Sequence, residues 1–199
     1  MYAAGLGASF AGVIFAGGPR ELAPGHARLV HAAAGGTVQR VGVFGTDFRT
    51  RIVEVTKIAP LDVVQLHSDP TPADVRAARL VFGGAVWAVV RVGGHAVPES
   101  AASLFGEADA VLLDAKVPGG LGGTGVALPW ARVAEGLSRI RQGSRLIVAG
   151  GLRPENVAEA VDALSPDIVD VSSGVESAPG IKDHARMLEF FRAATGSMA

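Results

Sequence analysis

Apolar positions along the chain fall into two alternating kinds of segment nearly to its end. Short, near-continuously apolar runs are typical of strands buried on both faces of a parallel sheet. We predict such strands at 9–15, 39–45, 62–67, 85–92, 109–115, 145–151 and 168–174. The stretches between them have helical periodicity, and we predict helices at 24–34, 50–59, 72–82, 99–105, 130–141, 154–164 and 183–194.

Several helix starts carry local signals. Pro24, Pro72 and Pro154 stand where a first helical turn tolerates a missing backbone N–H, and Thr71 is expected to cap the helix that follows it.

Strand–helix alternation of this length has two main solutions, an open doubly wound sheet or a closed barrel. The first strand is not followed by a G-x-G-x-x-G sequence, which a dinucleotide-binding sheet requires. Polar residues instead follow or end strands all along the chain, as at the mouth of a barrel: Asp47, His67, Arg91, Asp114 and Asp170. We therefore predict the α/β class with a TIM-type (β/α) barrel, as one domain over residues 1–194 with a disordered tail at 195–199.

Only seven strand–helix units are visible in this pattern. The opening MYAAGLGA is typical of the end of a helix followed by the turn into a strand. We therefore expect the first strand of the barrel to be missing, which leaves open edges through which copies of the chain could form a homo-oligomer.

Composition removes several classes of function. The 199 residues carry a formal net charge of -1, so there is no electrostatic case for a nucleic-acid or membrane partner. They contain no cysteine, which excludes disulfides and thiolate metal sites, and the histidines lack metal-ligand spacing. No apolar run is long enough to span a bilayer, so we expect a cytoplasmic location and no metal.

Two glycine-containing segments near the C-terminus predict a phosphate site. AGGLRPENV (149–157) and IVDVSSGVESAPGIKD (168–183) each end a strand and open a loop. Glycine lets backbone amides approach an anion closely, and barrels usually bind phosphate after their last two strands. The alternative is that these glycines only form tight turns. Their joint position in the last two units favours a phosphorylated small-molecule substrate.

Three other residues are candidates for chemistry. Within LLDAKVPGGLGGTG (112–125), Asp114 ends a strand and precedes a glycine-rich loop, which we predict to form a mobile lid; partial burial there would suit a proton donor. Arg20 follows the first visible strand and suits recognition of a carboxylate, although an isolated arginine is more often solvated. His67 follows a strand and could shuttle protons, although a lone histidine is more often structural.

Taken together, these segments resemble the phosphoribosylanthranilate isomerase family of tryptophan biosynthesis. The resemblance extends from about Gly7 to Ala194 and rests on GASFAGVIF, RVGVF, DVVQLH, LLDAKVPGGLGGTG, AGGLRPENV and DVSSGVESAPGIKD. It implies an Amadori rearrangement of N-(5-phosphoribosyl)anthranilate to 1-(2-carboxyphenylamino)-1-deoxyribulose 5-phosphate. The reaction needs no cofactor.

The resemblance also implies roles for individual residues. Asp114 matches the general acid that opens the ribose ring, and Arg20 matches the arginine that holds the anthranilate carboxylate. Asp170 matches an active-site carboxylate of the last strand. The positions that match the phosphate-binding residues of the family are Gly150, Gly151, Ser173 and Gly174.

The sequence departs from the family at the general base. Members carry a cysteine for this role on a first strand with a Lys-Ile-Cys-Gly-type motif, and these 199 residues contain no cysteine. His67, Asp170 or a positioned water are the alternatives for the base. Two other functions stay open: a phosphosugar-binding barrel without turnover, and the analogous sugar isomerase of histidine biosynthesis. The latter needs a second phosphate site, for which AGGP (16–19) is only a weak candidate.

Overall fold

The protein is described here from a computed structural model that covers residues 2–93, 97–116, 130–141 and 143–196. The chain divides into two units. One comprises Met1–Val89 with Glu107–Asp109, and the other comprises Val90–Gly106 with Ala110–Ala199. Each unit repeats the same pattern of a parallel strand followed by a helix.

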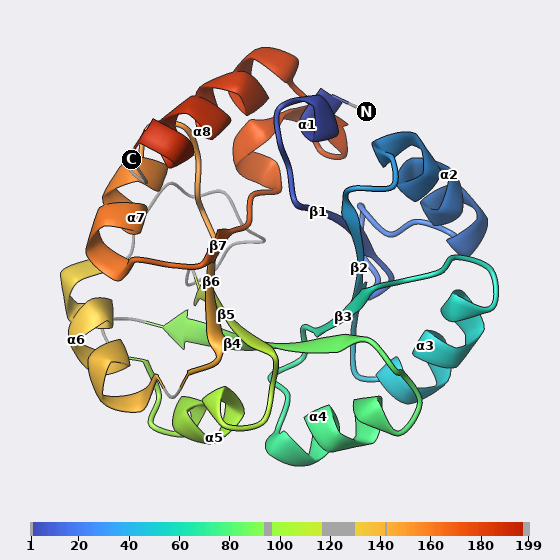
Figure 1. Ribbon diagram of the computed structural model, residues 1–199, viewed down its shortest axis with the longest axis horizontal. Coiled ribbons are helices and arrows are strands. Elements are labelled where there is room, and N and C mark those ends of the chain that lie inside the picture. The colour runs from blue at the N-terminus through green and yellow to red at the C-terminus, as the bar shows by residue number, and fades with distance from the viewer. Residues whose placement is uncertain (1, 94–96, 117–129, 142, 197–199) are drawn as a thin grey trace. The chain divides into compact units, whose positions relative to one another are not determined.

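In the first unit, parallel strands pair in chain order from β1 to β4. Its elements are α1 (Tyr2–Gly5), β1 (Phe10–Ile14), α2 (Pro24–Ala34), β2 (Gln39–Phe44), α3 (Phe48–Thr56), β3 (Val63–Leu66), α4 (Pro72–Arg79) and β4 (Ala85–Gly93), whose last residues pass into the second unit. In Figure 1, α2, α3 and α4 follow one another along one side of these strands.

The sheet of the first unit is strongly curled. The rings of Phe10 on β1 and Trp87 on β4 meet edge to face, with centroids 4.9 Å apart, although β2 and β3 separate their strands in the pairing order. A flat sheet would hold the outer two of four strands about 14 Å apart at normal strand spacing. Strands that form part of a barrel require a sheet curled in this way.

In the second unit, β5 (Ala110–Lys116), β6 (Arg145–Ala149) and β7 (Ile168–Val169) pair in parallel. The helices of this unit are α5 (Ala101–Phe105), α6 (Trp130–Ile140), α7 (Val157–Leu164) and α8 (His184–Gly196). After β7 the chain forms a 3-10 turn, η1 (Ser173–Val175), and a short antiparallel hairpin of β8 (Glu176–Ala178) and β9 (Ile181–Lys182). Figure 1 shows α7 and α8 side by side, in agreement with their packing.

The α/β class, all seven strands and all seven helices predicted from the pattern are confirmed, most within a few residues of the expected bounds. Thr71 caps α4 as predicted, through a reciprocal capping box with Asp74. The strand predicted at 168–174 is wrong in its second half, since β7 ends at Val169 and η1 follows. The small residues in this second half form a turn and do not pair with a neighbouring strand.

Two further boundaries differ from the predictions. Pro154 does not open its helix, because it lies in the turn before α7, which begins at Val157. The disordered tail expected at 195–199 is wrong for Thr195 and Gly196, because α8 continues to Gly196 and the Thr195 hydroxyl donates to the carbonyl of Phe191 at 2.7 Å. Residues 197–199 lie outside the described residues. In the part of the chain that the structure describes, no helix has the length and apolarity to cross a membrane.

Candidate functional site

Near the carboxyl ends of β5, β6 and β7, residues of the three strands lie in register. Asp114 on β5 pairs with Ala149 on β6, and Val148 pairs with Val169 on β7. The backbone N–H of Asp170 continues this register by donating to the carbonyl of Val148 at 2.9 Å. Residues paired in a parallel ladder point to the same face, so Asp114, the end of β6 and Asp170 form one row. Asp114 is half-buried within it and Asp170 is exposed.

The turn after β6 depends on two glycines and an asparagine. Gly150 and Gly151 have φ angles of 79° and 67°, in the left-handed region that glycine adopts without strain. The Asn156 side chain, which is buried, accepts from the N–H of Arg153 at 2.8 Å and donates to the carbonyl of Gly151 at 3.1 Å. These bonds fix the turn that precedes α7.

The η1 turn packs directly on the turn after β6. A Cβ atom built on Gly174 would lie 1.8 Å from the carbonyl oxygen of Leu152 and 3.2 Å from Cα of Arg153. Only a residue without a side chain allows this approach, so Gly174 has a steric role that its sequence position alone does not reveal. The two predicted phosphate-binding segments are thus in contact.

An ion pair between an exposed lysine and a buried glutamate also holds η1. Lys182 Nζ lies 3.0 Å from Glu176 Oε1, and it also donates to the carbonyl of Ser172 at 2.9 Å. The Glu176 side chain is only 4% exposed, so its carboxylate depends on Lys182 for a partner of opposite charge. Lys182 therefore ties the hairpin β8–β9 to the start of η1.

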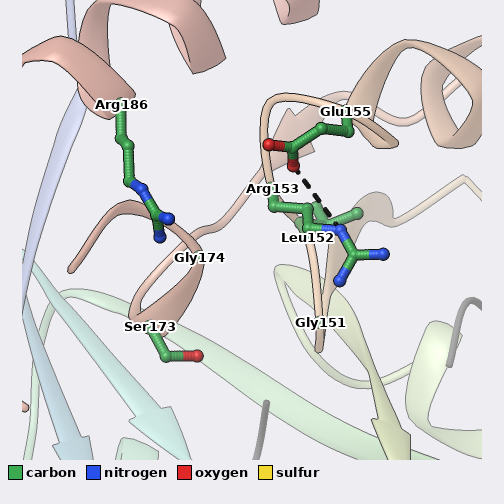
Figure 2. A pocket seen from close by; sticks show the side chains of 7 residues that line it. All are labelled: Gly151, Leu152, Arg153, Glu155, Ser173, Gly174 and Arg186. Atoms are coloured by element: carbon green, nitrogen blue, oxygen red, sulfur yellow. Dashed lines mark ion pairs between the residues drawn. The ribbon is translucent and has the colours of Figure 1, made fainter. Parts of the chain in front are cut away.

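Between the two turns lies a cavity of about 490 Å³. Its lining, drawn in Figure 2, consists of Gly151, Leu152, Arg153, Glu155, Ser173, Gly174 and Arg186. Three of the four predicted phosphate-binding residues, Gly151, Ser173 and Gly174, are among them, and the fourth, Gly150, directly precedes Gly151. The cavity is open, flanked by glycine backbone and rich in cationic groups, which suits a phosphate group.

Sequence reasoning missed the two arginines of this cavity. Arg153 forms an ion pair with Glu155, with Nε and Oε2 3.5 Å apart, as the dashed line in Figure 2 marks. Arg186 comes from α8, and its Nη1 donates to the carbonyl of Glu176 at 3.3 Å. Neither stands at a strand end, so the rule that located the other candidates did not apply to them.

The remaining candidates lie in the first unit. Arg20 is half-buried in the segment after β1, where Ile14 forms an isolated bridge with Glu21. His67 directly follows β3, and its backbone N–H donates to the carbonyl of Phe44 at 2.9 Å. His67 thus directly follows a strand, and Arg20 lies in the loop after one, at the positions that the sequence indicates. The segment predicted as a lid lies at 112–125, and from residue 117 it falls outside the described residues.

The described side chains contain no group of three or more histidine, cysteine or acidic residues able to hold a metal ion. The site therefore offers carboxylates, guanidinium groups and backbone amides as its chemistry.

Comparison with known proteins gives consistent matches. The family described as N-(5'phosphoribosyl)anthranilate (PRA) isomerase matches residues 2–193. The N-(5'-phosphoribosyl)anthranilate isomerase of Paramagnetospirillum magneticum is 40% identical over 195 residues, covering 96% of this chain and 88% of that protein.

Solved structures agree with the sequence matches. The phosphoribosyl anthranilate isomerase of Thermotoga maritima superposes with a TM-score of 0.84 at 31% identity, covering 98% of this chain and 92% of that one. A phosphoribosyl anthranilate isomerase in complex with reduced 1-(o-carboxyphenylamino)-1-deoxyribulose 5-phosphate superposes with a TM-score of 0.80 at 29% identity, covering 98% and 91%. The predicted (β/α)-barrel fold is thereby confirmed.

Proposed function

The chain belongs to the N-(5'-phosphoribosyl)anthranilate isomerase family, and on that premise we propose how it carries out the isomerase step of tryptophan biosynthesis. The reaction is the Amadori rearrangement of N-(5-phosphoribosyl)anthranilate to 1-(2-carboxyphenylamino)-1-deoxyribulose 5-phosphate. The observation that carries the proposal is the cavity in which Gly151, Ser173 and Gly174 meet beside the row of strand ends that includes Asp114.

Asp114 is the proposed general acid. It is half-buried and lies on β5, two residues before the end of this strand and in register with Ala149, the residue before Gly150. Protonation of the ribose ring oxygen by Asp114 breaks the bond between this oxygen and C1 and leaves a Schiff base. A base then removes the proton from C2, and the resulting enolamine tautomerises to the ketone. C2 is oxidised while C1 is reduced, so the reaction balances without a cofactor.

The other proposed roles concern binding. Arg20 holds the anthranilate carboxylate, because a guanidinium can donate two parallel hydrogen bonds to it. Gly150, Gly151, Ser173 and Gly174 hold the phosphate through backbone amides and the serine hydroxyl. Asp170, at the end of the same row as Asp114, and His67, after β3, are the candidates for the base or for contacts to the ribose, and a positioned water is the third candidate for the base.

A second candidate function is favoured by one observation. The 199 residues contain no cysteine, whereas the resemblance assigns the base of the family to a cysteine. A barrel that binds the phosphorylated ligand without turning it over is therefore the alternative. Loss of a general base typically lowers a rate by about 10²–10⁴-fold, so a slow enzyme lies between the two.

Two experiments separate these functions. Expression of the chain in a bacterial strain that lacks this isomerase should restore growth without tryptophan. Calorimetry with a reduced product analogue should show binding. Growth together with binding supports the isomerase, binding without growth supports the second candidate, and failure of both contradicts the proposal.

The proposal includes an assembly and a location. Residues 1–194 act as one (β/α)-barrel domain.

Gly12 on β1 is exposed, and the bridge between Ile14 and Glu21 covers only one end of the outer edge of β1 within the described residues. Self-association along this edge is expected, and light scattering that gives a strict monomer would contradict it.

The substrate carries a charged phosphate that membranes exclude, so a cytoplasmic location follows and cell fractionation tests it.

A further inference from the structure

Arg186 has a fixed backbone position beside the phosphate cavity. It lies in the first turn of α8, where Oδ1 of Asp183 accepts from the N–H groups of Ala185 at 2.9 Å and Arg186 at 3.1 Å. This capping interaction holds the start of the helix, and so the origin of the arginine side chain, against η1. The point from which the side chain departs is therefore set by the fold.

The side chain reaches from α8 to the turn that carries Gly174, as Figure 2 shows. Its Nη1 donates to the carbonyl of Glu176 at 3.3 Å, and Arg186 is one of the residues that line the cavity. The guanidinium is planar and carries five N–H donors, so one bond to a carbonyl uses only a small part of its capacity.

The charge of Arg186 is not compensated by a carboxylate. Arg153 is paired with Glu155 and Lys182 with Glu176, but within the described ranges no acidic side chain forms an ion pair with Arg186. Backbone amides are neutral donors, whereas a phosphate monoester carries between one and two negative charges at neutral pH. Among the residues that line the cavity, Arg186 is thus the source of net positive charge.

We propose that Arg186 is a direct ligand of the substrate's phosphate group, in addition to the glycine and serine positions of the two turns. This inference rests on the proposed function only for the identity of the phosphorylated molecule. The Arg186 guanidinium keeps its hydrogen bond to the Glu176 carbonyl and donates from its remaining nitrogen atoms to the phosphate. It thereby selects phosphorylated over unphosphorylated ligands.

Calorimetric titration with inorganic phosphate, with the reduced product analogue and with its dephosphorylated form tests this inference. Arg186→Ala should weaken the binding of both phosphate-containing ligands by about 10-fold or more, the usual effect of losing a charge-assisted hydrogen bond. Binding of the dephosphorylated form should stay unchanged. Arg192→Ala, which removes an exposed arginine further along α8, is the matched control and should bind like the wild type.

Two more variants separate charge from a structural role. Arg186→Lys keeps the charge and should retain most of the phosphate affinity. Arg186→Gln keeps a donor for the Glu176 carbonyl but loses the charge, so it should be as weak as Arg186→Ala. Wild-type phosphate affinity in Arg186→Gln, or an equal loss for the dephosphorylated form, would overturn the inference.

The outcomes for the wild type keep this inference apart from the proposed function. Binding of inorganic phosphate without binding of the analogue would contradict the isomerase function, while the phosphate titrations of the variants would still decide the role of Arg186. Absence of inorganic phosphate binding to the wild type would overturn the inference itself.

Discussion

Replacing Gly174 by alanine places a methyl carbon against the backbone of the neighbouring turn. The new Cβ would lie 1.8 Å from the carbonyl oxygen of Leu152, whereas ordinary contacts begin at 3.4 Å. The obstruction is main chain and cannot rotate away, so η1 and the turn after β6 must separate by well over an ångström. Overpacking of this kind costs about 1–3 kcal/mol of folding free energy.

The same displacement moves Ser173 away from Gly151 across the cavity. A shift of about 1 Å in a binding geometry can cost as much as about 10²-fold. We therefore expect Gly174→Ala to weaken binding of the reduced product analogue by at least about 10-fold, and to lower the melting temperature by several degrees for a chain of this size. Calorimetric titration and thermal unfolding followed by circular dichroism measure the two effects.

Gly136→Ala is the matched control for this prediction. Gly136 lies inside α6, and the atoms nearest to its built Cβ belong to Val97 at 3.8 Å or more, an ordinary contact. That substitution should leave ligand binding unchanged and stabilise the helix by up to about 1 kcal/mol. If Gly174→Ala bound and melted like the wild type while Gly136→Ala behaved as expected, the contact between the two turns would be refuted.

Three further substitutions test the fold and the site. Thr71→Ala removes the side-chain half of the α4 capping box and should cost about 1 kcal/mol in urea unfolding, with Thr71→Ser restoring it. Burial lowers the pKa of His31 below its ordinary value of 6.5, so the folded state disfavours protonation and the stability of the protein should fall as the pH drops below 6.5. Thermal unfolding at pH 5 and at pH 7.5 measures this loss of stability. The wild type and the control His26→Gln should lose the same amount, and His31→Gln should lose less. Asn156→Ala removes both hydrogen bonds that fix the turn at Gly151, so it should lower the free energy of unfolding by about 1–3 kcal/mol and weaken phosphate binding. Urea unfolding and phosphate titration measure these two effects. Unchanged stability would contradict the structural role of this buried amide.

Local signals account for the parts of the fold that the sequence predicts well. Residues 63–66 form a strand in which every residue is buried, and the three apolar residues among these four predict such a strand. The Thr71–Pro72 start of α4 follows from cap and proline preferences that involve only neighbouring residues. Because each strand–helix unit carries its own signals, the alternation and the class are predictable without knowledge of tertiary contacts.

Contacts between distant segments account for the parts that sequence does not predict. The run from 170 to 175 has apolar and small residues like a strand, but it bends into η1 where Lys182 and Leu152 approach it. Arg186 is indistinguishable in sequence from a solvated helix arginine until the direction of α8 relative to η1 is known. The sequence points to the two predicted phosphate-binding segments because glycine indicates close backbone approach, whereas an arginine that reaches the cavity from a helix outside these loops has no such local signal.

The most direct test of the central claim is the turnover of N-(5-phosphoribosyl)anthranilate, followed by the fluorescence of the anthranilate adduct. Removal of the proposed acid in Asp114→Asn should lower kcat/KM by about 10²–10⁴-fold with little change in the affinity for the reduced product analogue. Asp162→Asn, at an exposed position on α7, should match the wild type. A wild-type chain that turns over substrate faster than Asp114→Asn by this factor supports an isomerase that uses Asp114, and a wild type no faster than that variant contradicts it.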